Sequence, residues 1–473
     1  MTVLDAIRAH ARERPRHPAL IVDGPVPLPI DYATLVAGVD ARTRTLAAHG
    51  VGAGERCGLV ARPGRDFIET GLAIMATGAC MVPIAADTPA ALEQIARDAF
   101  LHHVAVAAAD GVRCERRGHV RLAADVEAAF RAVHPAYLRF TSGTTGRHKG
   151  VVIGHEAIVA RLAHANAGLA IGPEDRVLWL LPMAHHFVVS VLLYLHYGAT
   201  ILLPAGALAR AILTSAARER ASVLYASPYH YTLLAKDEGG AALPDLRLAV
   251  ATADRLRASV AERFVRRFGK PLVQALGVIE VGLPLMNLAS AAAKPESLGR
   301  PLPGFTITLR DERGAPLPPG GGRDAAGELC IHGPGMFDAY LDPWTPAAAV
   351  VAEHGFRTGD HAWIDEDGDV WLAGRYANRI SMAGLKFFCE EVEAVLETHP
   401  AVRAARVSPR PHEHVGEVPV AEVVARDPER PPTAESLVAH CRGALPSFKV
   451  PREFTVVADL PRTPTGKLRR WRD

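Results

Sequence analysis

A short polar segment at 137–151 has the residue types needed to bind a polyphosphate. It reads YLRFTSGTTGRHKGV, so an expected strand leads into a loop of hydroxyl residues and glycines that ends in Lys149. Glycines let backbone N–H groups approach an anion, hydroxyl groups donate hydrogen bonds, and an ammonium supplies compact positive charge. The segment is not a Walker loop, because GxxxxGK[ST] is absent, and its composition alone also fits a polar surface loop. The candidate phosphate-binding residues are Thr141, Ser142, Gly143, Thr144, Thr145, Gly146 and Lys149.

The residues around this loop alternate between expected strands and helices. A helical pattern at 35–49 stops at Gly50, and a buried strand at 57–60 follows. A second helix at 67–77 leads into a strand at 80–84. Short apolar strands recur at 176–181, 199–203, 223–226, 246–251 and 271–276. Such alternation predicts an α/β fold with parallel sheets that helices cover.

The character of the chain changes after residue 300. Short strands between Gly/Pro turns at 305–310, 327–331 and 369–373 predict a small β-rich subdomain. The segment 390–457 combines helical and strand patterns, which is typical of a compact α+β domain. The best candidate boundary is GRYAN at 374–378. We therefore expect a large N-terminal portion, 1–376, and a small C-terminal domain, 377–473.

Length, charge and cysteine usage exclude several classes of protein. A chain of 473 residues exceeds the roughly 250–300 residues at which single cores stop growing, so several domains are expected. A net charge of +2 offers no field that would concentrate nucleic acid or an anionic membrane. The cysteines form no CxxC pair, and no apolar run approaches the roughly 20 residues of a membrane span. The N-terminal segment is too charged for a signal peptide, so we expect a cytoplasmic protein.

The loop sequence TSGTTGRHKGVV resembles the phosphate loop of the ANL superfamily of adenylate-forming enzymes. This superfamily comprises acyl-CoA synthetases, the adenylation domains of nonribosomal peptide synthetases, and luciferases. Other segments are similar to its further core motifs in the same order, at 71–83, 181–185, 277–280, 327–329, 357–360, 374–375 and 460–468. The resemblance covers essentially the whole chain, and it implies an AMP-binding enzyme with a mobile C-terminal lid domain.

The resemblance implies roles for several single residues. Glu280 would hold Mg²⁺ against the phosphates, as a hard oxygen ligand does. Lys467 would act on the carboxylate and the α-phosphate during adenylation, where a point charge serves better than the wide fork of arginine. Together with Lys149, these residues form the expected catalytic set. The further residues expected to bind ATP or AMP are Asp254, Gly277, Asp360 and Arg375.

The resemblance also indicates a pocket for the acid. His185 and His186 lie where family members close the acyl pocket with a histidine or aromatic gate, although two packed histidines are the plainer interpretation. The remaining expected pocket residues are Ala251, Thr252, Ala253 and Gly282. Side chains in ATADRL replace the glycines of the related SGGAPL, which predicts a shallow pocket. The fourth motif lacks the aspartate that would hold an α-ammonium group, so an α-amino acid is disfavoured and a small or planar acid is favoured.

The sequence departs from the family pattern at several positions. Leu276 and Ile279 stand where an aromatic residue would stack on adenine and a threonine would touch phosphate. Ala377 replaces the usual Asp or Lys hinge residue, and Gly384 lies in the loop expected to serve the thiol step. We expect weaker or altered adenine packing, with the hinge kept at the domain boundary.

These observations predict an ATP-dependent, AMP-forming acid–thiol ligase. A carboxylic acid would be adenylated with release of pyrophosphate, and the acyl group would pass to coenzyme A or to a phosphopantetheinyl thiol. The alternatives are an adenylating enzyme that loads a carrier protein in natural-product biosynthesis and a ligase-like enzyme for an unusual oxyacid such as nitrite. A degenerate member that only binds nucleotide is a further alternative, which Leu276 and Ile279 motivate.

Overall fold

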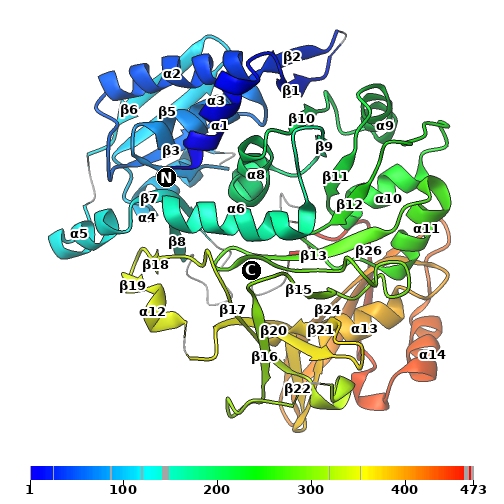
Figure 1. Cartoon of the computed structure of the whole chain (residues 1–473). Helices are drawn as coiled ribbons and strands as arrows, with labels where there is room; N and C mark the ends of the chain where they lie inside the picture. The colour runs from blue at the N-terminus through cyan, green and yellow to red at the C-terminus, as the bar shows by residue number, and fades with distance from the viewer. Residues whose placement is uncertain are drawn as a thin grey trace. The chain divides into compact units, whose positions relative to one another are not determined.

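The computed structural model describes residues 2–24, 26–85, 88–118, 121–140, 149–318, 320–351, 353–462 and 468–469. The chain divides into two compact units (Figure 1). Unit 1 comprises Met1–Ser142, His148–Thr306 and His332–Phe356, and unit 2 comprises Gly143–Arg147, Ile307–Ile331 and Arg357–Asp473. Among the described residues, no helix is long and apolar enough to cross a membrane.

Unit 1 contains a nine-stranded sheet in the order β15-β14-β13-β12-β11-β9-β10-β1-β2. Its central strands, from β13 to β1, run parallel, and antiparallel strands extend both edges. The strands are β1 (Pro18–Val22), β2 (Leu28–Asp31), β9 (Arg176–Trp179), β10 (Thr200–Leu203), β11 (Val223–Ala226), β12 (Leu248–Ala251), β13 (Leu272–Val278), β14 (Gly282–Met286) and β15 (Arg300–Pro301). Strand β11 is buried at every position, as central parallel strands are.

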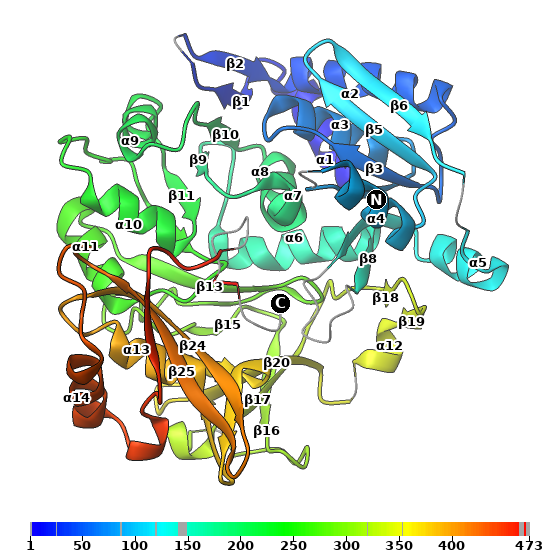
Figure 2. The same ribbon diagram turned by 180° about the vertical axis from the view of Figure 1, so that it is seen from behind.

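A second sheet in unit 1 has eight strands in the order β19-β18-β8-β7-β4-β3-β5-β6. Strands β7, β4, β3 and β5 run parallel, while the β5–β6 hairpin closes one edge and β8, β18 and β19 extend the other (Figure 2). The strands are β3 (Arg56–Val60), β4 (Cys80–Pro83), β5 (His103–Ala108), β6 (Gly111–Arg116), β7 (Pro135–Phe140), β8 (Gly150–Gly154), β18 (Ala339–Tyr340) and β19 (Thr345–Pro346).

Helices cover these sheets, and α6 (His155–Leu169) contacts both of them through β8 and β14. Helix α2 (Tyr32–Ala48) begins where Asp31 accepts a hydrogen bond from Thr34 N at 2.7 Å, and it ends before Gly50, whose φ is +85°. The remaining helices of unit 1 are α1 (Val3–Glu13), α3 (Arg65–Ala76), α4 (Pro89–Asp98), α5 (Ala124–Ala132), α7 (Met183–His186), α8 (Leu192–His196), α9 (Ala209–Arg218), α10 (Pro228–Lys236), α11 (Ala258–Phe268) and α12 (Ala347–Val350).

Unit 2 is built on two smaller sheets. A four-stranded sheet has the order β16-β17-β20-β21, and a second sheet joins β23-β22-β25-β24 with β26 paired to β25. Helix α13 packs on β24, and α14 packs on α13, around a core that contains Val392, Val407 and Leu437. The elements are β16 (Thr306–Arg310), β17 (Gly327–His332), β20 (Phe356–Ile364), β21 (Val370–Arg375), β22 (Arg379–Met382), β23 (Leu385–Phe388), α13 (Cys389–Leu396), β24 (Val402–His412), β25 (Gly416–Ala425), α14 (Ala434–Ala444) and β26 (Phe454–Val457).

The predicted α/β fold is confirmed. In unit 1, helices cover two sheets whose central strands run parallel. In unit 2, two smaller sheets are accompanied by helices α13 and α14. One refinement concerns the sheets, which are mixed rather than wholly parallel because hairpins and short strands are added at their edges. Most predicted strands are found within one or two residues of the expected bounds. The boundary between 376 and 377 stays a prediction.

Candidate active site

The predicted phosphate loop reaches the described part of the chain only at its last residue. Lys149 lies exposed immediately before β8. Two groups of predicted residues lie outside the described residues, namely Thr141, Ser142, Gly143, Thr144, Thr145 and Gly146 of the loop and Lys467 near the C-terminus. The site is therefore built here from the residues of each unit that the structure describes.

Lys149 and Glu280 are linked through one tyrosine. Glu280 follows β13, is 8% exposed, and its Oε1 accepts a hydrogen bond from the Tyr340 hydroxyl at 3.0 Å. The Lys149 ammonium lies 4.8 Å from the centre of the same tyrosine ring, within the range of a cation–π interaction. Strand pairing places Tyr340 opposite Val151, two residues after Lys149. The fold thus brings together two predicted catalytic residues that are far apart in sequence.

A buried arginine fixes the backbone around Glu280. Arg161, in α6, is 1% exposed and donates hydrogen bonds to the carbonyl oxygens of Gly335 at 2.8 Å, Ile279 at 2.8 Å and Glu280 at 3.3 Å. The Glu280 carbonyl also accepts from Phe337 N at 2.7 Å. These bonds tie the turn after β13 to the segment before β18, so the direction of the Glu280 side chain is set by three separate parts of unit 1.

Packing against Arg161 requires a glycine at position 282, which is one of the predicted pocket residues. Its φ is +107°, and a Cβ added there would lie 2.9 Å from Arg161 Cγ. Gly335 has a φ of +67°, and its added Cβ would lie 2.6 Å from Arg161 N. Both positions need the left-handed backbone that glycine adopts freely, and both leave no room for a side chain. Gly282 therefore serves the packing around Glu280.

The electrostatics of this cluster favour a cation beside Glu280. Burial raises the pKa of the Glu280 carboxyl. The Tyr340 hydrogen bond and the charges of Arg161 and Lys149 lower this pKa, but they offset the effect of burial only in part. Burial likewise raises the pKa of Tyr340 and lowers the pKa of Arg161 to about 10. Among the described residues, no group of three or more His, Cys, Asp or Glu side chains could hold a metal ion by itself. A single buried carboxylate does fit Mg²⁺ that keeps most of its ligands from phosphate and water.

The two histidines of the predicted gate differ in their surroundings. Arg139, in β7, donates through Nη1 to the His185 carbonyl and places Nη2 3.2 Å from His185 Nδ1. The His186 ring packs edge-on against Trp179, and the His186 carbonyl accepts from the Ser190 hydroxyl. A π-helical turn, η1 (Phe187–Val191), follows at once. Such turns are frequent at functional sites, and no residue pattern in the sequence indicated this one.

The other predicted pocket residues lie at the end of β12. Ala251 and Thr252 are buried, and the Thr252 hydroxyl donates to the Ala275 carbonyl at 3.1 Å. Ala253 has a φ of +73°, a conformation that suits glycine and that an alanine adopts only under strain. Ala253 therefore adopts a backbone conformation in which a glycine would be unstrained.

Three aromatic side chains fill the space between the gate and this strand end. Trp179 stacks on Tyr225 with ring centres 5.8 Å apart, and Tyr194 packs against both. Burial raises the pKa of Tyr225 to about 12, and the Thr252 side chain acts in the opposite direction. Among the described residues, the Trp179 Nε1 and the Tyr194 hydroxyl have no hydrogen-bond partner. We call Trp179, Tyr194 and Tyr225 the aromatic cluster; no motif in the sequence singled it out.

The remaining predicted nucleotide contacts of unit 1 are more open. Asp254 is exposed, and its carboxylate accepts a hydrogen bond from Arg255 N at 2.8 Å. Gly277 is exposed within β13, with the Thr252 hydroxyl 4.0 Å from where its Cβ would lie. Leu276 is half-buried opposite Leu285 of β14, so it takes part in sheet packing.

Unit 2 pairs the two predicted ribose-binding residues. Asp360 is 4% exposed, and the Arg375 Nε donates to its Oδ1 at 2.9 Å. The two residues are register partners across β20 and β21. Ala377 lies in a short 3₁₀ turn, Tyr376–Asn378, and Gly384 lies at an exposed turn between β22 and β23 with a φ of +82°. The fold thus brings these two predicted residues, 15 positions apart in sequence, into direct contact.

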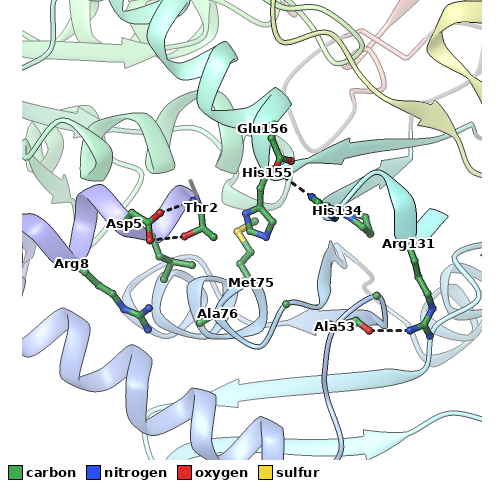
Figure 3. A pocket seen from close by; sticks show the side chains of 14 residues that line it. Thr2, Asp5, Arg8, Ala53, Met75, Ala76, Arg131, His134, His155 and Glu156 are labelled. Atoms are coloured by element: carbon green, nitrogen blue, oxygen red, sulfur yellow. Dashed lines mark hydrogen bonds and ion pairs between the residues drawn. The ribbon is translucent and has the colours of Figure 1, made fainter. Parts of the chain in front are cut away.

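One distinct cavity of unit 1, of about 500 Å³, lies away from these residues. Figure 3 shows its lining side chains, which come from α1, the end of α3, the end of α5, the starts of β7 and α6, and the segment before β3. They include Asp5, Arg8, Met75, Arg131 and His155. It contains no predicted site residue, so the cavity does not mark the candidate active site.

Family models match most of the chain. The model described as AMP-binding enzyme matches residues 7–341, and the model described as AMP-binding enzyme C-terminal domain matches residues 391–467. Both matches agree with the order in which the motifs occur along the sequence.

Known proteins with similar sequences and structures include ligases. A sulfoacetate–CoA ligase of Cupriavidus necator is 31% identical over 71% of this chain, which spans 66% of that relative. Novobiocin biosynthesis protein H of Streptomyces niveus is 29% identical over 97% of this chain and 80% of its own length. The ATP-bound structure of MatB from Rhodopseudomonas palustris has a TM-score of 0.84 at 23% identity and covers 99% of this chain and 97% of its own. At this level of sequence identity, the similarity to MatB shows that the fold is shared and nothing more.

Proposed function

Because this chain belongs to the AMP-binding enzyme family of adenylate-forming enzymes, we propose that it is an ATP-dependent acid–thiol ligase. In the first half-reaction, a carboxylate oxygen of the acid attacks the α-phosphorus of ATP in line. The bond to the β-phosphate oxygen breaks, and acyl-AMP and pyrophosphate form. In the second half-reaction, a thiol attacks the acyl carbon, AMP leaves, and a thioester results. The observation that carries this proposal is the linkage of Lys149 to Glu280 through Tyr340.

The residues contribute mainly position and charge, so no protein nucleophile is needed. Lys149 supplies positive charge to the phosphates, and Lys467 supplies it to the carboxylate and α-phosphate. Glu280 would hold Mg²⁺, which when bound neutralises charge that develops on phosphoryl oxygens. The rigid setting of Glu280 supports this role, because a carboxylate fixed by its neighbours does not have to reorganise during the reaction. Asp360 and Arg375 are proposed to bind the ribose, with Asp254 as a further nucleotide contact.

The acid is proposed to be small or planar and to lack an α-amino group. The aromatic cluster packs against His186, one of the predicted gate residues. Three large buried rings leave little volume for an extended chain at this end of the sheet. The relative from Cupriavidus necator, named for the short acid sulfoacetate, agrees with a short substrate.

The thiol is coenzyme A or a carrier-bound phosphopantetheine. The names of the ligase relatives support coenzyme A, and the relative from Streptomyces niveus, named for novobiocin biosynthesis, supports a role in a natural-product pathway. The loop at Gly384 and the turn at Ala377 are proposed to act in the thioester step. With coenzyme A or with phosphopantetheinylated carrier supplied separately, only the true acceptor should sustain AMP release beyond a single turnover.

The deciding experiment is acid-dependent ATP–pyrophosphate exchange over a panel of short aliphatic, sulfonated and aromatic acids. Exchange with one or more acids, with a hydroxamate formed when hydroxylamine is added, is the expected result. ATP turnover without hydroxamate would favour an oxyacid such as nitrite instead. Absence of exchange with every acid, while ATP still binds, would overturn the ligase proposal in favour of a nucleotide-binding protein.

A further inference from the structure

We propose that Arg139 is a positioning residue that holds the imidazole of His185 in a single orientation and a single tautomer. This inference rests on the proposed function, because His185 belongs to the same candidate site. It gives a role to a residue that precedes the phosphate loop and that no recognised motif assigns.

The strand that carries Arg139 determines what its side chain contacts. In β7, side chains alternate between the two faces of the sheet, so Tyr137 and Arg139 lie on the same face. The Tyr137 hydroxyl donates to the Ala184 carbonyl at 3.4 Å, and Arg139 donates to the carbonyl of the next residue, His185. Two residues of one strand thus hold two successive carbonyls of α7.

The second contact of Arg139 decides the state of the imidazole. Its Nη2 lies 3.2 Å from His185 Nδ1. A guanidinium has five N–H donors and no acceptor, so Nδ1 must act as the acceptor. In the neutral ring, the proton then lies on Nε2. The neutral Nδ1–H tautomer would place an N–H group against the guanidinium N–H, and the doubly protonated ring would in addition place a second positive charge there. The contact therefore favours a neutral His185 that offers an Nε2–H donor.

Arg139 stays charged at neutral pH because a guanidinium does not lose its proton in proteins. Burial lowers the pKa of Arg139, while the nearby Tyr137 and Glu280 groups act in the opposite direction. A lysine has a single nitrogen in place of the planar fork, so it could not donate to the His185 carbonyl and to Nδ1 in the same geometry. An arginine at this position couples the end of β7 to the gate histidine in a way that few other residues could.

The test uses the full chain and two measurements. Selective ¹⁵N labelling of histidine, with His185→Gln used to assign the signal, reports the tautomer of His185 by NMR. We expect one Nε2–H tautomer in the unchanged protein and a mixture in Arg139→Met. The rate constant of ATP–pyrophosphate exchange should fall about tenfold, near the effect of losing one charge-assisted hydrogen bond, with the KM for ATP changed less than about twofold. Arg139→Lys should restore part of the rate, and Tyr137→Phe, which loses only the bond to Ala184, is the matched control.

The proposal would be overturned if Arg139→Met and Arg139→Gln kept the single tautomer. A double variant gives a second test, in which Arg139→Met is combined with His185→Ala. The proposal would also be overturned if Arg139→Met lowered the exchange rate by the same factor in the His185→Ala background as in the unchanged protein. If Arg139→Met does not fold, Arg139→Gln decides the question by the same NMR signal. Failure of the proposed function has a different signature, because the unchanged protein would then show no exchange with any acid while the tautomer measurement still applies.

Discussion

The two units hold their predicted nucleotide-binding carboxylates by different means. In unit 1, Tyr340 donates to the Glu280 side chain, and Arg161 and Phe337 donate to its carbonyl. In unit 2, Asp360 is paired with Arg375, its register partner, whose side chain is 52% exposed. The carboxylate of unit 1 depends on packing between distant segments, whereas that of unit 2 depends on one local strand pair.

This difference indicates that the Glu280 carboxylate is coupled more strongly to the stability of the protein than the Asp360 carboxylate is. Buried carbonyls and charges that lose a partner are costly, because water cannot replace the lost hydrogen bond. The Asp360–Arg375 pair is exposed on the arginine side alone, so water screens the guanidinium while the carboxylate stays buried. Changes around Glu280 should therefore alter both stability and catalysis, whereas changes at Arg375 should alter mainly nucleotide binding.

The largest effect is expected from Arg161→Met. This change removes the Arg161 hydrogen bonds to the Gly335 and Ile279 carbonyls and one of the two to the Glu280 carbonyl, and we expect the free energy of unfolding to fall by about 3–5 kcal/mol. The shift of the urea unfolding midpoint measures it. Arg220→Met, which removes an exposed pair with Asp245, is the control and should leave the unfolding midpoint nearly unchanged. Equal effects of the two variants would contradict the claim that the buried hydrogen bonds of Arg161 stabilise unit 1 more than an exposed ion pair does.

Glu280→Gln should have the next largest effect, this time on catalysis. The amide oxygen can still accept the Tyr340 hydrogen bond, but the charge that would hold Mg²⁺ is lost. We expect exchange to fall about 100-fold, consistent with the several kcal/mol that a metal ion supplies to phosphoryl chemistry. The unfolding midpoint should stay the same or rise, because a neutral side chain is easier to bury. Exchange near the unchanged rate, measured at saturating Mg²⁺, would contradict the role given to Glu280.

Tyr340→Phe should act more mildly. It keeps the ring that faces Lys149 and removes only the hydroxyl that donates to Glu280. We expect about a tenfold loss of exchange, the size expected for one hydrogen bond to a carboxylate. Tyr194→Phe is the matched control, because the Tyr194 hydroxyl has no hydrogen-bond partner among the described residues. Removal of that hydroxyl should leave the free energy of unfolding unchanged or raise it. A smaller loss for Tyr340→Phe than for the control would show that the linkage is not used.

The smallest effect on stability is expected from Arg375→Met in unit 2. The free energy of unfolding should fall by less than in Arg161→Met, because one ion pair with a half-exposed guanidinium is lost in place of several buried hydrogen bonds. The KM for ATP should nevertheless rise several-fold if Asp360 and Arg375 bind the ribose. Kinetics at varied ATP and the urea midpoint together separate these outcomes. Destabilisation as large as that of Arg161→Met would mean that the two units hold their carboxylates in the same way.

Local patterns predicted most of the elements that carry the site. The strand before the phosphate loop, the strand that ends at Ala251 and strand β21 were all expected from apolar runs and turn residues, whereas β20 was not. Antiparallel edge strands such as β18 were not expected, because two residues with no alternating pattern carry no periodic signal. The π-helical turn η1 was missed for the same reason, since its apolar run also fits an ordinary helix.

The sequence by itself determined the α/β class, the order of the elements and the family, because these depend on local periodicity and on motifs with fixed spacing. It also predicted roles for Glu280, Lys149, Asp360 and His185. Only the tertiary structure decided how these residues are held: Tyr340, Arg161 and Arg139 reach them from other strands and helices. No spacing rule along one chain predicts such contacts, because they depend on how sheets and helices pack across long sequence separations.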